Sequence, residues 1–208
     1  MWKMIVSAAF AVSFSIGTAN ALSLSTGFGG PPGSATSGGM FDIIVDGQDL
    51  TMTAVGANIQ TDPGASVFIR QGSFVGNEFS AAGWTQIFSD PSFVGAGNDV
   101  ESVIDVNDFG LLAGQTYGIA IFVPDRMESA TGTGLGNVAA TNADLSILEG
   151  SMVGSNFGSE FTGGFISAAV TVETTIYYDK AVVPVPAPLA LLATGIVAVG
   201  IFARRKTN

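Results

Sequence analysis

The sequence predicts an all-β protein: an antiparallel β-sandwich of jelly-roll type, with an N-terminal signal helix and one C-terminal transmembrane helix. Short β-branched and aromatic runs alternate with Gly, Asp and Pro turn signals through the middle of the chain. No run there carries a helical apolar stripe. Only 12% of the 208 residues are charged and 47% are hydrophobic, whereas a typical soluble domain is about 25% charged. The longest apolar segments lie at the two ends.

The first 21 residues have the composition of a secretory signal peptide. Lys3 supplies an early positive charge, an apolar run follows it, and Ala19 and Ala21 form a small-x-small cleavage site. The apolar run is short for a membrane span. We therefore expect cleavage after Ala21, with Leu22 as the new N-terminus. A retained anchor or a buried N-terminal helix is the alternative.

Residues 22–39 are rich in Ser, Gly, Pro and Thr, which predicts a flexible leader. One β-sandwich domain is expected over residues 40–181. In its fifth expected strand, Ile104 faces the opposite way from Glu101 and Asp105, as in antiparallel sheets with one wet face. The strands are expected near residues 40–46, 49–60, 65–71, 84–89, 100–106, 115–123, 144–149 and 165–178.

Residues 182–208 combine a proline motif, an apolar stretch and a basic end. The stretch 185–203 contains no charged residue, and its 19 residues would span about 28 Å as a helix, close to the bilayer core. The prolines restrict the expected transmembrane helix to residues 188–203. The basic end stays cytoplasmic by the positive-inside rule, so the preceding chain lies outside. The motif is Val183, Pro184, Val185, Pro186 and Ala187. The anchor residues are Leu189, Leu192, Ile196, Phe202, Arg204, Arg205 and Lys206.

This order of motif, span and basic cluster resembles the PEP-CTERM class of sorting tails, in particular the VPLPA-CTERM variant. The glutamate of a Pro-Glu-Pro core is absent, and Val185 stands where the variant has leucine. The resemblance implies a Gram-negative surface protein that uses the export machinery and an exosortase-type processing enzyme. It implies an inner-membrane intermediate with a periplasmic ectodomain, then cleavage near the motif and a final place at the cell surface or outside the cell. An ordinary single-pass anchor is the alternative.

Part of the central domain resembles a domain that recurs in exported bacterial β-proteins, often with the same kind of tail. The resemblance spans roughly residues 40 to 123. No activity is assigned to that domain, so the resemblance implies a fold and no mechanism. The matching segments are residues 40–43, 72–78, 82–85 and 112–118.

The composition excludes several function classes. The chain has no cysteine and no histidine, which rules out disulfides, a thiol nucleophile, a Cys or His zinc site and a histidine-based triad. Seventeen acidic residues face only Arg70, Arg126 and Lys180 in the exported part, so its net charge is −14. This acidity argues against nucleic-acid binding. We expect a structural or interaction role in the envelope or extracellular polymer, with no catalysis and no required cofactor.

Calcium is the one metal for which the sequence offers candidates. Five oxygen-bearing side chains lie within ten residues, and hard oxygen ligands suit Ca²⁺. The segment that starts at Asp105 begins like an EF-hand loop but lacks the closing glutamate. Turn capping and surface charge are the plainer interpretation. The candidates are Asp99, Glu101, Asp105, Asn107 and Asp108.

Sugar binding is the alternative function. Trp84 is the only tryptophan outside the signal peptide, and an aromatic ring beside calcium would suit a carbohydrate-binding module with an extracellular polysaccharide as partner. A core role for Trp84 is the plainer interpretation. A carboxylate glycosidase is a third class, but no spacing pairs two of the glutamates. Residues 129–143 and 150–164 are expected to be Gly- and Ser-rich loops suited to assembly.

Overall fold

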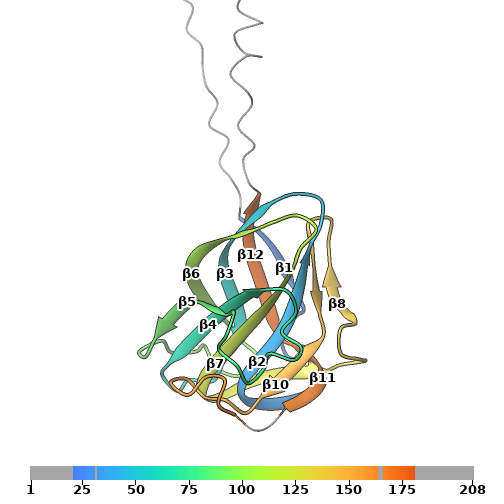
Figure 1. The fold of residues 1–208 in the computed structure, drawn as a ribbon. Helices are drawn as coiled ribbons and strands as arrows, with labels where there is room; N and C mark the ends of the chain where they lie inside the picture. Colours follow the sequence, from blue (N-terminus) through green and yellow to red (C-terminus); the bar gives the residue numbers. More distant parts are fainter. Residues whose placement is uncertain (1–20, 31, 164–165, 181–208) are drawn as a thin grey trace, which may run out of the picture.

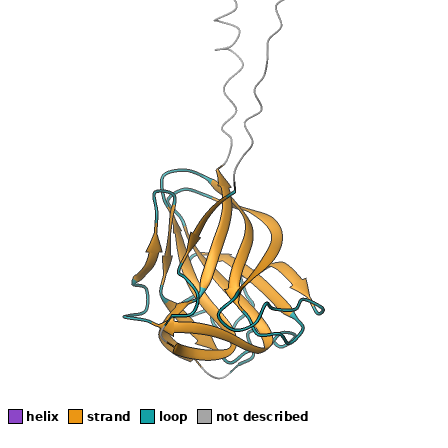
Figure 2. Cartoon of the chain, turned by 180° about the vertical axis from the view of Figure 1, so that it is seen from behind, coloured by secondary structure: helices purple, strands orange, loops and turns teal. Residues whose placement is uncertain are grey.

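The computed structural model describes residues 21–30, 32–163 and 166–180. Within these ranges the chain forms twelve strands and no helix, in two antiparallel sheets of four and eight strands (Figures 1 and 2). This confirms the predicted all-β class and is consistent with a β-sandwich. Among these residues no helix has the length and apolarity needed to cross a bilayer. The predicted sorting tail and, apart from Ala21, the predicted signal peptide lie outside the described residues.

The smaller sheet joins strands that are far apart in the sequence. Its order is β1-β12-β3-β6, so β12 is an inner strand. Leu22 of β1 lies opposite Tyr178 of β12, and Lys180 at the end of β12 lies opposite Leu50 of β3. The strands are β1 (Leu22–Ser25), β3 (Leu50–Asn58), β6 (Glu101–Leu111) and β12 (Thr174–Lys180).

The larger sheet has the order β5-β4-β7-β11-β10-β2-β9-β8, and an additional pairing joins β7 to β2. The four strands β2, β7, β11 and β10 therefore form a closed ring. Gly150 permits one close approach in this ring, because a Cβ there would collide with the carbonyl oxygen of Met40. The strands are β2 (Pro32–Val45), β4 (Ala65–Gln71), β5 (Thr85–Asp90), β7 (Thr116–Thr131), β8 (Val138–Thr141), β9 (Leu145–Leu148), β10 (Gly150–Val153) and β11 (Ile166–Val172).

The buried apolar side chains form two clusters, and successive residues of β7 belong alternately to one and to the other. Ile119 and Ile121 belong to the main core, which also includes Ile104 and Ile176 of the smaller sheet. Ala120 and Phe122, which alternate with Ile119 and Ile121, belong to a second cluster on the other face of β7. The first half of β7, from Tyr117 to Val123, is therefore buried on both faces. The second cluster consists of Met40, Phe74, Ala120, Phe122, Val153 and Phe161, with Phe68 and Trp84 packed against it.

The predicted flexible leader is wrong. Residues 22–39 contain all of β1 and the first part of β2. Leu22 and Leu24 are half-buried and pack against the main core, because β1 pairs with β12 near the other end of the chain. The Ser and Gly content suggested a loop, but this partner lies about 150 residues away and leaves no local signal. The folded domain therefore begins at β1, not at residue 40.

The expected loops and the last expected strand also need correction. Residues 129–143 include the end of β7 and all of β8, and residues 150–164 include β10. The single strand expected over residues 165–178 is two strands in different sheets, β11 and β12, which meet at Glu173. Short strands with small side chains look like loops by composition, and only their pairing partners reveal them.

The strand directions give the domain two ends. β1 begins and β12 ends at one end, which also carries the turns 46–49, 112–115 and 142–144 (Figure 1). We call this end the tail pole. The opposite end, where β1 and β3 finish and β6 and β12 begin, carries the loops 26–30, 59–64 and 91–100. We call it the distal pole.

Candidate functional site

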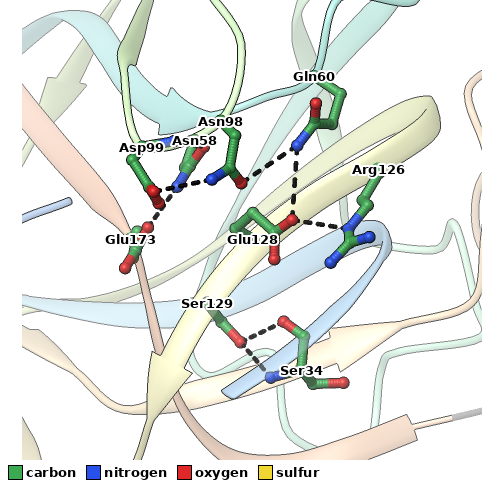
Figure 3. Close-up of polar contacts among 9 residues, drawn as sticks. All are labelled: Ser34, Asn58, Gln60, Asn98, Asp99, Arg126, Glu128, Ser129 and Glu173. Atoms are coloured by element: carbon green, nitrogen blue, oxygen red, sulfur yellow. Dashed lines mark hydrogen bonds and ion pairs between the residues drawn. The ribbon is translucent and has the colours of Figure 1, made fainter. Parts of the chain in front are cut away.

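The distal pole contains a polar hollow of about 280 Å³. Its walls come from the loop after β1, the loop before β6, the second half of β7 and the junction of β11 with β12. Four segments that are distant in the sequence therefore meet there (Figure 3). The lining residues are Gly30, Asn98, Asp99, Arg126, Glu128, Ser129 and Glu173.

Glu173 is the most buried charged group of the hollow, with 3% of its surface exposed. It stands where the chain passes from the larger sheet to the smaller one. The Nδ2 of Asn58 donates to its Oε2 at 2.5 Å, and the backbone N–H of Gly30 donates to its Oε1 at 2.9 Å. Two neutral donors thus compensate the lost hydration of this carboxylate, as burial requires.

Asn58 links Glu173 to the loop before β6. Its side-chain oxygen accepts a hydrogen bond from the backbone N–H of Asp99 at 3.1 Å. Asp99 has a φ of 59°, a left-handed conformation that Asp tolerates better than most residues. Asn98 donates to the Asp99 carboxylate at 2.7 Å. One buried amide therefore holds the base of the hollow and its rim together.

The remaining wall is an ion pair with one neutral hydrogen-bond partner, Gln60. The Nε of Arg126 lies 2.6 Å from the Oε1 of Glu128. Gln60 donates to the same Oε1 at 3.5 Å and to Asn98 at 3.2 Å, so it bridges the wall to the rim (Figure 3). Arg126 is half-exposed, which limits the stability that its ion pair contributes.

The hollow carries an excess of negative charge. Three carboxylates, those of Asp99, Glu128 and Glu173, face the single guanidinium of Arg126. The other lining residues supply the amide of Asn98, the hydroxyl of Ser129 and the backbone of Gly30. Such a surface can hydrogen-bond a small hydroxyl-rich or cationic group. In the part of the chain that the structure describes, no group of three or more His, Cys, Asp or Glu residues is arranged to hold a metal ion.

The structure does not bring the five calcium candidates together. Asp99 lies in the hollow, but Glu101 accepts a hydrogen bond from the hydroxyl of Tyr177 at 3.0 Å. The segment that begins like an EF-hand loop is part of the long strand β6. Its three candidates are exposed and follow one another along that strand. They are Asp105, Asn107 and Asp108.

Sequence reasoning missed Asn58, Glu128 and Glu173 as members of one site. They lie on β3, on β7 and between β11 and β12, and only the pairing of those strands brings them together. Glu173 did leave one signal, a charge in the middle of a β-branched run. A charged residue inside such a run is buried only with partners. The sequence does not reveal that Asn58 is the partner.

Trp84 packs against the second apolar cluster. Its ring centroid lies 5.3 Å from that of Phe161, and the Cζ of Arg70 lies 5.6 Å from the centre of the indole ring. Its Nε1 donates to the backbone oxygen of Asn77 at 3.2 Å. The ring is therefore engaged within the domain, as a core aromatic would be.

A buried carboxylate anchors the segment that ends at Trp84. The hydroxyl of Ser73 donates to Asp42 at 2.5 Å, and the backbone N–H of Phe74 donates to it at 2.9 Å. Burial raises the pKa of Asp42, although these two hydrogen bonds and the nearby charge of Arg70 oppose that shift. Asp42 thus fixes the start of the loop that covers the second cluster.

No protein-family model matches the chain, and no curated protein is similar to it at a significant level. The fold and the hollow define the protein as an acidic, all-β domain with a polar hollow at one pole.

Proposed function

We propose that this protein is exported and displayed at the surface of a Gram-negative cell. There it acts as a structural or interaction component of the envelope or extracellular matrix. In this proposal a C-terminal exosortase-type signal sorts the protein, with an inner-membrane intermediate before release or attachment. In this proposal the domain has a binding or structural role and does not catalyse a reaction.

The observation that carries the proposal is that the start of β1 and the end of β12 both lie at the tail pole. β1 begins at Leu22, the residue that follows the expected cleavage site at Ala21. Removal of a signal peptide there would leave every described strand intact. β12 ends at Lys180, three residues before the motif residue Val183. A domain held by such a tail would turn its distal pole, with the hollow, away from the membrane.

The charge distribution supports the same role. All three cations of the exported part are engaged within the domain. Arg126 and Lys180 form ion pairs with Glu128 and Asp144, and Arg70 lies over the ring of Trp84. The surface is therefore dominated by carboxylates. Such a surface keeps an exported protein soluble and repels nucleic acid.

Fractionation and mass spectrometry of the full chain test the proposal, in a Gram-negative host that has an exosortase-type enzyme. We expect a surface form that starts at Leu22 and lacks peptides from residues 189–204. Pro184→Ala with Pro186→Ala should retain the protein at the inner membrane. The matched control, Pro63→Ala in an exposed turn, should be sorted normally. Intact tail peptides in the surface fraction would refute processing, and a cytosolic protein would refute export.

The polar hollow favours a second candidate, the calcium-assisted carbohydrate-binding module. Its carboxylates and amide are groups that bind sugar hydroxyls, although Trp84 is committed to packing. Glycan-array binding that is lost with chelator and with Glu128→Gln would support this candidate. Binding that is unaffected by Glu128→Gln would place the sugar elsewhere. Turnover of a glycan, lost in one Glu→Gln variant, would instead support a glycosidase.

A further inference from the structure

We propose that β12 carries mechanical tension between the C-terminal tether of the domain and a ligand bound at the distal pole. In this proposal Asp144 transfers part of the tension from the smaller sheet to the larger one. This inference rests on the proposed function, because it needs a protein held at its C-terminal end. It goes further by assigning a mechanical role to named residues.

The first support is the position of β12 inside the smaller sheet. It is bonded on one side to β1 and on the other to β3. The pairing with β3 extends from Thr174 opposite Ala57 to Lys180 opposite Leu50, along the whole of β12. The strand that leads to the tail is therefore held on both edges, whereas an edge strand would be held on one.

The second support is the direction of the strands. β12 ends at the tail pole and its antiparallel neighbour β3 ends at the distal pole. A pull between the two poles therefore acts along the strands. Hydrogen bonds between antiparallel strands are perpendicular to the strand axis, so such a pull loads all of them together. A pull across the strands would load them one after another.

The third support is the attachment of the end of β12 to the larger sheet. The Nζ of Lys180 lies 2.8 Å from the Oδ1 of Asp144, and the hydroxyl of Tyr178 donates to the Oδ2 of Asp144 at 3.2 Å. Asn142 donates to the same hydroxyl at 2.9 Å. Asn142 and Asp144 belong to the turn between β8 and β9. Tension at Lys180 is therefore shared between the smaller sheet and this turn of the larger one.

The buried position of Tyr178 makes this attachment firm. Its side chain has 1% of its surface exposed and is among the largest fully buried side chains of the described residues. The phenol ring belongs to the main core while its hydroxyl reaches the turn. Withdrawing the end of β12 would have to expose this ring and break its hydrogen bonds at the same time.

β1 gives the opposite loading geometry. Its first residue, Leu22, lies opposite Tyr178, so a pull between the start of β1 and the end of β12 separates neighbouring strands at the tail pole. The short edge strand β1 would then peel away one residue pair at a time. In the processed protein the N-terminus is expected to be free, so this weak direction would carry no tension.

Single-molecule force spectroscopy can compare the two directions in the same domain. The chain has no cysteine, so introduced cysteines are unique handles. One variant of the full chain, in detergent micelles, carries Asp62→Cys in the exposed loop after β3 and Ala181→Cys after β12. A second variant carries Ser23→Cys, at an exposed position of β1, and Ala181→Cys. We expect the first rupture force of the Asp62 pair to be at least about twofold higher, because it loads the β3–β12 hydrogen bonds together. Equal forces, or a reversed order, would overturn the inference.

The role of Asp144 has its own control. Asp144→Ala in the Asp62 pair should lower the first rupture force. Asp108→Ala removes the same charge from an exposed site on β6 and should leave the force unchanged. Circular dichroism before pulling verifies that each variant is folded. A force that does not respond to Asp144→Ala would refute the sharing of tension between sheets. Because these measurements use purified protein, mislocalisation in cells would refute only the proposed function.

Discussion

The side-chain amide of Asn58 donates to the buried carboxylate of Glu173 across 2.5 Å, in a hydrogen bond between the end of β3 and the residue that joins β11 to β12. Its other end accepts from the backbone N–H of Asp99. This one side chain therefore supports both a buried charge and the loop that forms the rim of the hollow. The two bonds make Asn58 a link between the buried carboxylate and the rim of the hollow.

Asn58→Ala should destabilise the domain by about 2–3 kcal/mol, because it removes a donor from a buried carboxylate. Denaturant unfolding measures this loss. Asn107→Ala, at an exposed position on β6, is the control and should change the unfolding free energy by less than about 0.5 kcal/mol. Equal effects of the two substitutions would mean that Asn58 does not support Glu173.

The end of β12 should loosen in acid. The hydrogen bond from Lys180 is the leading cause that lowers the pKa of Asp144 below its ordinary value of 3.8. A lowered folded-state pKa stabilises the folded state above 3.8, and this contribution is lost as the pH falls through the lowered value. The hydrogen-exchange protection factors of residues 176–180, corrected for the intrinsic exchange rate at each pH, should therefore fall below pH 3.8. Asp144→Asn should make these protection factors less dependent on pH, whereas Asp108→Asn should not.

Asp42 should show the opposite pH dependence. Burial raises its folded-state pKa above 3.8, so the folded state binds the proton more tightly than the unfolded state. Its contribution to stability is therefore present below pH 3.8 and is lost as the pH rises through the raised value. The stability of Asp42→Asn relative to the natural protein should rise from pH 3 to pH 7. The exposed control Asp105→Asn should show no such rise. A relative stability that falls with pH would contradict the assignment.

Trp84 should contribute to the free energy of unfolding whether or not a ligand is present. Trp84→Ala removes a ring that packs on Phe161 and on the guanidinium of Arg70, and should cost about 2–4 kcal/mol in unfolding free energy. Trp84→Phe should recover part of this loss. Phe79→Ala, at a side chain that is 45% exposed, is the control and should cost less than about 1 kcal/mol. A fully stable Trp84→Ala variant that loses glycan binding would instead favour a sugar-contact role.

The predictable part of the fold is the part with strong local patterns. The expected strand at residues 65–71 coincides with β4, and the alternation of Ile104 with Glu101 and Asp105 matches the burial along β6. Alternation depends only on which face of a strand is wet, and the sequence records that directly. On the first half of β7 a second apolar cluster covers the other face, so both faces are buried and no alternation marks the strand.

The unpredicted part depends on contacts between distant residues. β1 resembles a loop because its partner β12 comes about 150 residues later. The hollow depends on Asn58, Glu128 and Glu173, and no spacing between them announces a site. The five calcium candidates are close in sequence but do not form a site. Asp105 and Asp108 lie along the extended strand β6, so their carboxylates are not arranged around one ion.

By itself the sequence determined the all-β class, the acidity, the absence of thiol and imidazole chemistry, and most strand positions. Composition and period-2 alternation are local properties that need no partner. Only the tertiary structure decided that β1 and β12 are neighbours, that the start of β1 and the end of β12 share one pole, and that a buried glutamate lies in a hollow at the other pole. These features arise from pairing between strands that are far apart in the sequence, and the burial of both paired strands determines their register.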